Sequence, residues 1–363
     1  MNKTFLCLFF SLALGLNAQD LSTYGWSFYD TANKNLKNNH ITDILFDKAG
    51  RTWVSTGNQA LYVWEKGKWA EIKRPLPDSM VNGWLYCMAW ENEHLLVFGG
   101  AMGHLTYLYT PGRYWYSRPL PEKDMQAMQI HIEDKTLLAG TNKGLYQLKD
   151  GKWKALIRDY GDVLGLSVLK NGDVIAGLRN GSFKLKYKEE KGYSVVRCFT
   201  PLALYDAVSD SSGTLWGAAF NDLQLHRFHR DSIDSVVSPP QDIFYNLNGS
   251  WKYCIHKTSV LPDGRIMFGT QFNAGIAAKS DNFWEIYLLP LNGTFDGVNR
   301  IRIAPDSSIW IATWHHGVAV FSPKNHKYHR HELRKKQPLQ TLPGQERKPN
   351  QGNYPDIIEM RHE

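Results

Sequence analysis

The sequence predicts an all-β fold, a seven-bladed β-propeller of four-stranded antiparallel blades. Its 363 residues include 13 Trp, 18 Tyr, 16 Phe and 30 Gly, and this composition is typical of strands and tight turns because rings suit a pleated surface and glycine permits chain reversal. In addition, a unit of two apolar runs joined by a polar turn recurs about every 40 residues. A repeat of that length built from short strands is the signature of a propeller.

The first 18 residues have the pattern of a secretory signal peptide. Lys3 provides a positive start, Phe5 to Leu16 is an apolar run, and Ala18 ends the segment with a small residue. The run is shorter than the roughly 20 residues that a membrane span needs, and a buried helix in its place would be expected to show a polar face. We therefore expect an exported protein, periplasmic, at the cell surface or secreted, that does not span the membrane.

Seven copies of the repeat follow, each recognised by the second strand of its unit. In the first copy, the run that begins at Ile41 turns at Asp47 to Gly50 and returns through Trp53 to Thr56. Turns rich in Asp, Asn and Gly precede the other second strands too, as hairpins require. The second strands are expected around Trp53, Leu96, Leu138, Ile175, Trp216, Met267 and Trp310.

Each unit continues into an outer strand that often carries aromatic residues. Stacked blades leave a gap that widens toward the rim, and rings that fill this gap explain the aromatic excess without any ligand. Gly25–Tyr29 resembles such an outer strand, so we expect it to complete the last blade and close the ring, with Lys327–Leu333 as the alternative. The propeller is expected over residues 19–335, followed by a loose, Pro- and Gln-rich C-terminal tail over 336–363.

The first repeat resembles the two-component regulator propeller repeat. The stretch from Leu36 to Ile41, then Asp47, Gly50 and the run from Trp53 to Thr56, follows the pattern of that family. The last unit matches through Trp310 to Thr313 and through Gly317-Val318, and the looser resemblance covers about residues 24–333. It implies an exported propeller like the periplasmic sensor regions of hybrid two-component systems, which often recognise carbohydrate fragments. Because we find no kinase or DNA-binding output, we expect a stand-alone propeller.

Candidate ligand-binding residues lie in the loops between second and third strands, which in propellers gather around the central channel. Asn occurs in five of these loops, and the last one contains Trp and two His. Amides, an aromatic ring and imidazoles suit a polyhydroxylated ligand; alternatively, Asn occupies these turns because it tolerates left-handed backbone geometry. The candidates are Asn58, His104, Asn142, Asn180, Asn221, Asn273, Trp314, His315 and His316, with Trp84 as a second ring in a loop.

Patterns for catalysis or metal binding are weak. Asp43, Asp206 and Asp296 lie near the starts of inner strands, where they would either face the channel or bond to neighbouring backbone amides. The sequence contains no nucleophile elbow, P-loop or Cys-x-x-Cys pair. We therefore expect no cofactor, no metal and no assigned catalytic residue.

Charge and cysteine usage add two expectations. The net charge of +7 comes from basic residues spread over outer strands and the tail, and with export this argues against a nucleic-acid partner. We expect a monomer. Cys87, Cys198 and Cys254 are expected to be buried, unreactive thiols.

The sequence therefore favours a non-catalytic, sensor-like propeller that binds a glycan or a protein partner. Two alternatives stay open. One is a propeller enzyme, a lyase or hydrolase that acts on polysaccharide, and the other is an interaction scaffold in an envelope complex. Saccharide binding without product formation would separate the binder from the enzyme.

Overall fold

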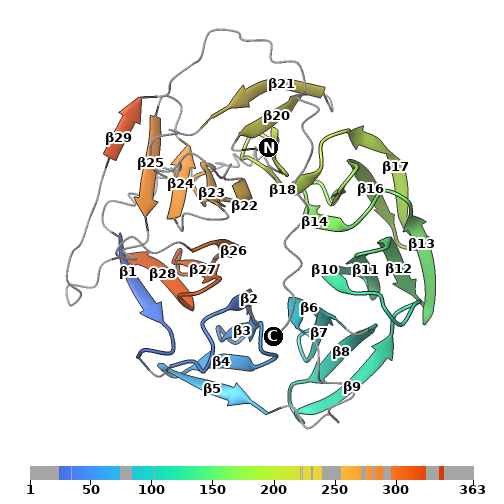
Figure 1. Cartoon of the computed structure of the whole chain (residues 1–363), viewed down its shortest axis with the longest axis horizontal. Coiled ribbons are helices and arrows are strands. Elements are labelled where there is room, and N and C mark those ends of the chain that lie inside the picture. Colours follow the sequence, from blue (N-terminus) through green and yellow to red (C-terminus); the bar gives the residue numbers. More distant parts are fainter. Residues whose placement is uncertain are drawn as a thin grey trace, which may run out of the picture.

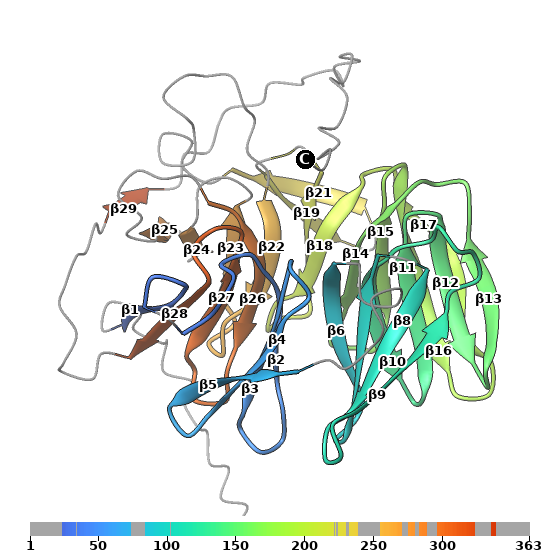
Figure 2. The ribbon, with the colours of Figure 1, turned by 60° about the horizontal axis from the view of Figure 1, so that its bottom comes forward.

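The computed structural model describes residues 24–33, 35–73, 84–101, 103–220, 222, 224–229, 232–238, 255–270, 275–279, 283–288, 296–323 and 335–338. Their strands form separate antiparallel sheets arranged as a ring around a central axis (Figure 1). In every sheet the first strand of the unit lies nearest the axis, and the later strands follow toward the rim (Figure 1). Figure 2 shows the same blades in a tilted view. The fold is an all-β propeller.

The first three sheets contain twelve strands in simple chain order from the axis to the rim. They are β2 (Ile41–Phe46), β3 (Thr52–Thr56), β4 (Leu61–Glu65) and β5 (Lys68–Ile72); β6 (Leu85–Asn92), β7 (Leu95–Gly100), β8 (His104–Tyr109) and β9 (Tyr114–Pro119); and β10 (Ala127–Glu133), β11 (Thr136–Thr141), β12 (Gly144–Lys149) and β13 (Lys152–Ile157).

The next two sheets have the same order. They are β14 (Val163–Val168), β15 (Val174–Leu178), β16 (Gly181–Lys188) and β17 (Gly192–Thr200), followed by β18 (Leu204–Ser209), β19 (Leu215–Ala219), β20 (Leu225–His229) and β21 (Ser232–Val237).

The remaining two sheets each contain a strand from far away in the sequence. One is β22 (Ile255–Val260), β23 (Ile266–Thr270), β24 (Gly275–Lys279), β25 (Phe283–Leu288) and β29 (Lys335–Pro338). The other is β26 (Val298–Ile303), β27 (Ile309–Thr313), β28 (Val318–Pro323) and β1 (Tyr24–Tyr29). All seven second strands predicted from the repeat are present, as β3, β7, β11, β15, β19, β23 and β27.

The predicted set of seven four-stranded blades is wrong. Among the described residues, six blades have four strands, and the remaining sheet has five because β29 pairs with the outer edge of β25. The physical reason is that the outer edge of a sheet presents unpaired N–H and C=O groups, which a passing segment of the same chain can satisfy. Residues 335–338, at the predicted boundary between propeller and tail, supply that segment.

The ring is closed by the N-terminal strand. β1 pairs antiparallel with β28 from Tyr24 opposite Pro323 to Tyr29 opposite Val318. This is the position predicted for Gly25–Tyr29, and the alternative closing segment, Lys327–Leu333, lies outside the described residues, as do the predicted signal peptide and the residues after 338.

Aromatic side chains pack between neighbouring blades, as the composition suggests. Trp53 of β3 meets Trp90 of β6 with ring centroids 5.7 Å apart. On the other side of the same blade, Tyr29 contacts Trp64 at 4.7 Å and lies parallel to Trp310 at 6.2 Å. These rings fill blade interfaces, so most of the aromatic excess is architectural.

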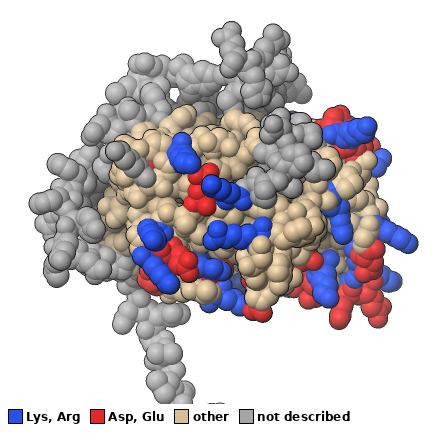
Figure 3. Space-filling view, turned by 90° about the horizontal axis from the view of Figure 1, so that it is seen from below, with Lys and Arg blue, Asp and Glu red and all other residues tan. Residues whose placement is uncertain are grey.

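Two surface properties complete the description. Seen from below, Lys and Arg side chains are interspersed with Asp and Glu rather than gathered into one patch (Figure 3). Within the described part of the chain, no helix has the length and apolar character required to cross a membrane.

Candidate functional site

The predicted asparagines hold their own loops together. Asn58 is exposed, and its Oδ1 accepts a hydrogen bond of 2.5 Å from the Thr56 hydroxyl. The Asn142 Oδ1 accepts from the Gln126 amide at 2.8 Å. Asn180 is exposed, and its backbone amide donates to the Tyr160 carbonyl at 3.1 Å. Asn221 and Asn273 lie outside the described residues.

Left-handed geometry does not explain these asparagines. Asn58, Asn142 and Asn180 do not have a positive φ; in their loops the positive φ values belong to Gln59, at 72°, and to Gly144 and Gly181, at 107° and 143°. The amides of Asn58 and Asn142 instead serve as side-chain caps for their loops. The alternative explanation, that Asn occupies these turns because it tolerates left-handed backbone geometry, is therefore wrong.

The predicted Trp314-His315-His316 loop is organised around one buried carboxylate. Asp296 is 2% exposed, and its Oδ1 accepts hydrogen bonds from the backbone amides of Trp314, at 2.8 Å, and His315, at 3.0 Å. Its Oδ2 lies 2.7 Å from the His316 Nδ1. The Trp314 indole N–H donates to the Asn299 side chain. Asp296 thus fixes the loop while the His315 side chain stays 65% exposed.

A second aromatic and histidine pair lies beside this loop. The rings of His40 and Trp84 meet edge to face with centroids 4.9 Å apart. Both contact Gly57, where a Cβ would lie only 3.2 Å from either ring, so glycine leaves room for them. Burial lowers the pKa of His40, the nearby His315 lowers it further, and Asp296 opposes both effects.

The Gly317 amide at the end of the Trp314 loop donates to the Asn39 carbonyl at 2.9 Å, so His40 lies next to this loop. We call Trp84, His40, Trp314, His315 and His316 the aromatic–histidine cluster. His104 is the first residue of β8, opposite Pro119 of β9.

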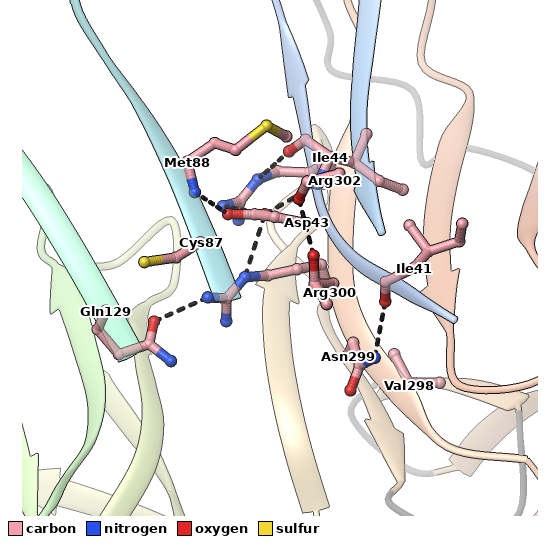
Figure 4. A network of polar contacts seen from close by, with 12 residues as sticks. Ile41, Asp43, Ile44, Cys87, Met88, Gln129, Val298, Asn299, Arg300 and Arg302 are labelled. Carbon is pink, nitrogen blue, oxygen red and sulfur yellow. Dashed lines mark hydrogen bonds and ion pairs between the residues drawn. The ribbon is translucent and has the colours of Figure 1, made fainter. Parts of the chain in front are cut away.

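A polar cavity lies where the inner strands of the ring meet, and Figure 4 shows part of the polar network in its wall. Its volume is about 80 Å³, and every inner strand contributes to its wall. Each inner strand has a register irregularity at its third residue, and such a bulge can redirect a side chain. These third residues are Asp43, Cys87, Gln129, Gly165, Asp206, Lys257 and Arg300.

Asp43 connects neighbouring blades in this wall. It is 1% exposed, and its Oδ2 accepts from the Met88 backbone amide of the next blade at 2.8 Å. Its Oδ1 lies 3.1 Å from the Arg300 Nε and 3.5 Å from the Arg302 Nη2. Asp43 therefore combines both roles considered for it, since it faces the channel and binds a backbone amide (Figure 4).

Asp206 has the equivalent role on the other side of the channel. Its Oδ2 accepts from the Thr258 amide of the next blade at 2.9 Å, and its Oδ1 accepts from the Ser167 hydroxyl at 2.7 Å. Asp43 and Asp206 both line the cavity, whereas Asp296 fixes the Trp314 loop. The three aspartates therefore do not form one site.

The cations of the cavity are the residues that sequence reasoning missed. Lys257 is 5% exposed, and burial together with Arg300 lowers its pKa to about 7 against the attraction of Asp206 and Asp43. The available signal is a charged residue at the third position of both β22 and β26, which an alignment of the repeats places at equivalent positions around the ring.

The cysteine prediction is only partly correct. Cys87 is buried, and burial raises the pKa of its thiol to about 12. Cys198 is exposed on β17, an outer strand with one face toward solvent, so the expectation of burial is wrong there. Cys254 lies outside the described residues.

The class of protein that these features define is a β-propeller with a polar axial cavity and an aromatic–histidine face. Residues 35–58 match the family model described as two component regulator propeller. This match confirms the family resemblance of the first repeat. No curated protein sequence matches the chain significantly.

Solved structures with the same fold serve different functions. The extracellular domain of a hybrid two component system from B. thetaiotaomicron is 12% identical with a TM-score of 0.63, covering 81% of this chain and 39% of that one. The virginiamycin B lyase from Staphylococcus aureus is 13% identical with a TM-score of 0.63, covering 82% and 99%. The WD40 propeller domain of Doa1 is 12% identical with a TM-score of 0.61, covering 84% and 99%.

At these identities the comparisons establish the fold alone. The chain spans about two fifths of the length of the two component system domain that it resembles.

Proposed function

We propose that this chain is an exported, non-catalytic propeller that binds a glycan or a protein partner, as a sensor domain does, through the aromatic–histidine cluster. The observation that carries the proposal is the link between the Trp314 loop and the His40–Trp84 ring pair. The Asn299 side chain, which accepts from the Trp314 indole, donates to the carbonyl of Ile41, the residue after His40, at 2.7 Å. Indole faces pack on sugar rings, and imidazole nitrogens exchange hydrogen bonds with hydroxyl groups. A glycan is the occupant that this combination fits best.

Rigidity supports the same proposal. Asp296 fixes the backbone of the Trp314 loop with hydrogen bonds of 2.8 and 3.0 Å, and preorganised groups lose less entropy when a ligand binds. The signal-peptide pattern in residues 1–18 supports export to a compartment in which glycans are available. The repeat shared with the two component regulator propellers supports a sensor-like role.

A glycan array followed by thermal shift on residues 19–363 tests the proposal. We expect at least one saccharide to raise the melting temperature without release of reducing ends or unsaturated sugar. The double variant Trp314→Ala/His315→Ala should abolish this shift because it removes the stacking ring and the exposed imidazole. The matched control Trp153→Ala/His94→Ala, on the outer strand β13 and on the turn after β6, should keep it.

An unchanged ligand-induced shift in the Trp314→Ala/His315→Ala variant would place the site elsewhere. If no saccharide binds and a pull-down from envelope extracts recovers a membrane protein instead, the scaffold alternative replaces the glycan.

One observation favours a second candidate function. The 2.7 Å contact between Asp296 and the His316 Nδ1 is the arrangement in which a carboxylate orients an imidazole for proton transfer. A polysaccharide lyase or hydrolase would use it so, and product formation that disappears in His316→Gln would establish this candidate over the binder.

A further inference from the structure

The axial cavity contains more positive than negative charge. Lys257, Arg300 and Arg302 line it together with two carboxylates, Asp43 and Asp206. A buried charge without a partner is costly, and the usual remedy is an opposite charge with good hydrogen bonds. The wall of the cavity contains two carboxylates and three cationic side chains, so one positive charge is not balanced.

Lys257 is the cation that remains unpaired. Among the described residues, no hydrogen bond or ion pair within 4.0 Å joins its ammonium to a partner, although it is 5% exposed and lines the cavity. The two carboxylates are already used. Asp43 contacts both arginines, and Asp206 accepts from Ser167 and from the Thr258 amide.

Arg300 also retains hydrogen-bonding capacity. It is 7% exposed, and its Nε and Nη2 donate to Asp43, at 3.1 Å, and Gln129, at 2.8 Å. A guanidinium has five N–H donors, so others remain for a group inside the cavity. The Arg302 side chain is 40% exposed, which indicates that the cavity communicates with solvent at that level.

The size of the cavity limits its occupant. A cavity of about 80 Å³ is roughly half as large as an apolar cavity of about 150 Å³ that binds benzene, and it matches one anion of four or five non-hydrogen atoms. A sugar ring is too large. Oxygen anions of this size accept the charge-assisted hydrogen bonds that lysine and arginine offer.

We propose that the axial cavity is a binding site for one small oxyanion, a carboxylate or sulfate, held by Lys257 and Arg300. The anion neutralises the excess positive charge and fastens the inner strands β22 and β26 to the same ligand. The site is separate from the aromatic–histidine cluster, and it stands whether or not that cluster binds a glycan.

Isothermal titration calorimetry with the full mature chain tests the proposal, using sodium sulfate and sodium acetate as probes at pH 6 and constant ionic strength. We expect saturable 1:1 binding of at least one probe. Lys257→Met should weaken it at least tenfold. Gln129→Glu should do the same, because the new carboxylate can still accept from Arg300 while it cancels the positive charge. Lys48→Met, whose lysine side chain is 84% exposed, is the matched control and should bind like the wild type.

Two results would overturn the proposal. One is the absence of saturable binding of both probes to the wild-type protein. The other is an affinity in Gln129→Glu and in any folded Lys257→Met that equals that of Lys48→Met. Because Gln129→Glu replaces only the side-chain amide nitrogen by an oxygen, the test does not depend on the stability of the lysine variant.

Discussion

At the scale of single residues, the Asp and the Trp of the repeat signature form hydrogen bonds that connect the turn to the second strand. The Asp47 Oδ1 accepts from the Ala49 and Arg51 amides at 2.9 Å, and its Oδ2 accepts from the Trp53 indole at 2.8 Å. Asp210 contacts Trp216 in the same way, at 2.9 Å. The spacing between Asp and Trp in the family pattern is therefore the spacing that lets the Asp carboxylate accept from the Trp indole. We call this arrangement the Asp–Trp clip.

We expect Asp47→Ala to lower the free energy of unfolding by about 2–3 kcal/mol, measured by urea denaturation at pH 7, because it removes several bonds to a carboxylate. Burial would raise the pKa of Asp47, but hydrogen bonds from Trp53 and Arg51 and the charge of Arg51 hold it below its usual range. The Asp47 carboxylate is therefore protonated at a lower pH in the folded state than in the unfolded state. The stabilisation is complete above about pH 4 and is lost as the pH falls through the lower folded pKa.

Asp306→Ala provides the comparison for this prediction. Asp306 contacts the Ser308 hydroxyl at 2.6 Å, and Ser308 rather than Asp306 accepts from the Trp310 indole, at 2.9 Å. We expect a smaller loss there. Equal losses in the two variants, or a loss for Asp47→Ala that persists unchanged at pH 2, would contradict the Asp–Trp clip.

At the scale of elements, each second strand has a small residue opposite the bulged third residue of the inner strand. These small residues are Ser55, Gly99, Gly140, Gly177, Ala218, Gly269 and Ala312. The reason is the proximity of the next blade. A Cβ on Gly177 would lie 1.8 Å from the Leu204 carbonyl oxygen of β18, and one on Gly99 would lie 2.6 Å from the Ala127 carbonyl oxygen of β10.

We expect Gly177→Ala to destabilise the protein by about 2–3 kcal/mol in urea denaturation, because the methyl group forces β15 and β18 apart. Gly112→Ala is the matched control, since its Cβ would meet no atom closer than 3.6 Å, the Cδ1 of Tyr109. It should change the stability by less than about 0.5 kcal/mol. Similar values for both variants would show that the blades adjust to the added methyl group.

The sequence predicts those features that depend on residues close together in the chain. The second strands and β1 follow from local patterns, because apolar runs and Asp–Gly turns are properties of neighbouring residues. The Trp314-His315-His316 loop stands out in the sequence because it departs from the repeat. The fifth strand β29 and the cavity were missed because each depends on distant segments, and Lys257 and Arg300 look like ordinary polar positions until the ring brings them together.

At the scale of the whole molecule, the two ends of the propeller are joined by one strand pair. β1 and β28 are almost 300 residues apart in the chain and pair over six residues. Their contact closes the ring, so a large loop entropy opposes it and local packing has to compensate. Tyr24 supplies much of that packing. It is 6% exposed, lies 5.3 Å from the Phe321 ring, and donates through its hydroxyl to the Ser307 carbonyl at 3.3 Å.

We therefore expect Tyr24→Ala to lower the free energy of unfolding by about 3 kcal/mol, as truncation of a buried aromatic residue usually does, and to accelerate proteolysis of the native protein. The exposed tyrosine of an ordinary outer strand is the matched control: Tyr114 on β9 is 65% exposed, and Tyr114→Ala should cost less than about 0.5 kcal/mol. Urea denaturation and limited proteolysis of both variants provide the measurement. If Tyr24→Ala resembles Tyr114→Ala in both assays, the β1–β28 pair contributes little to stability, and the ring is held by contacts between adjacent blades alone.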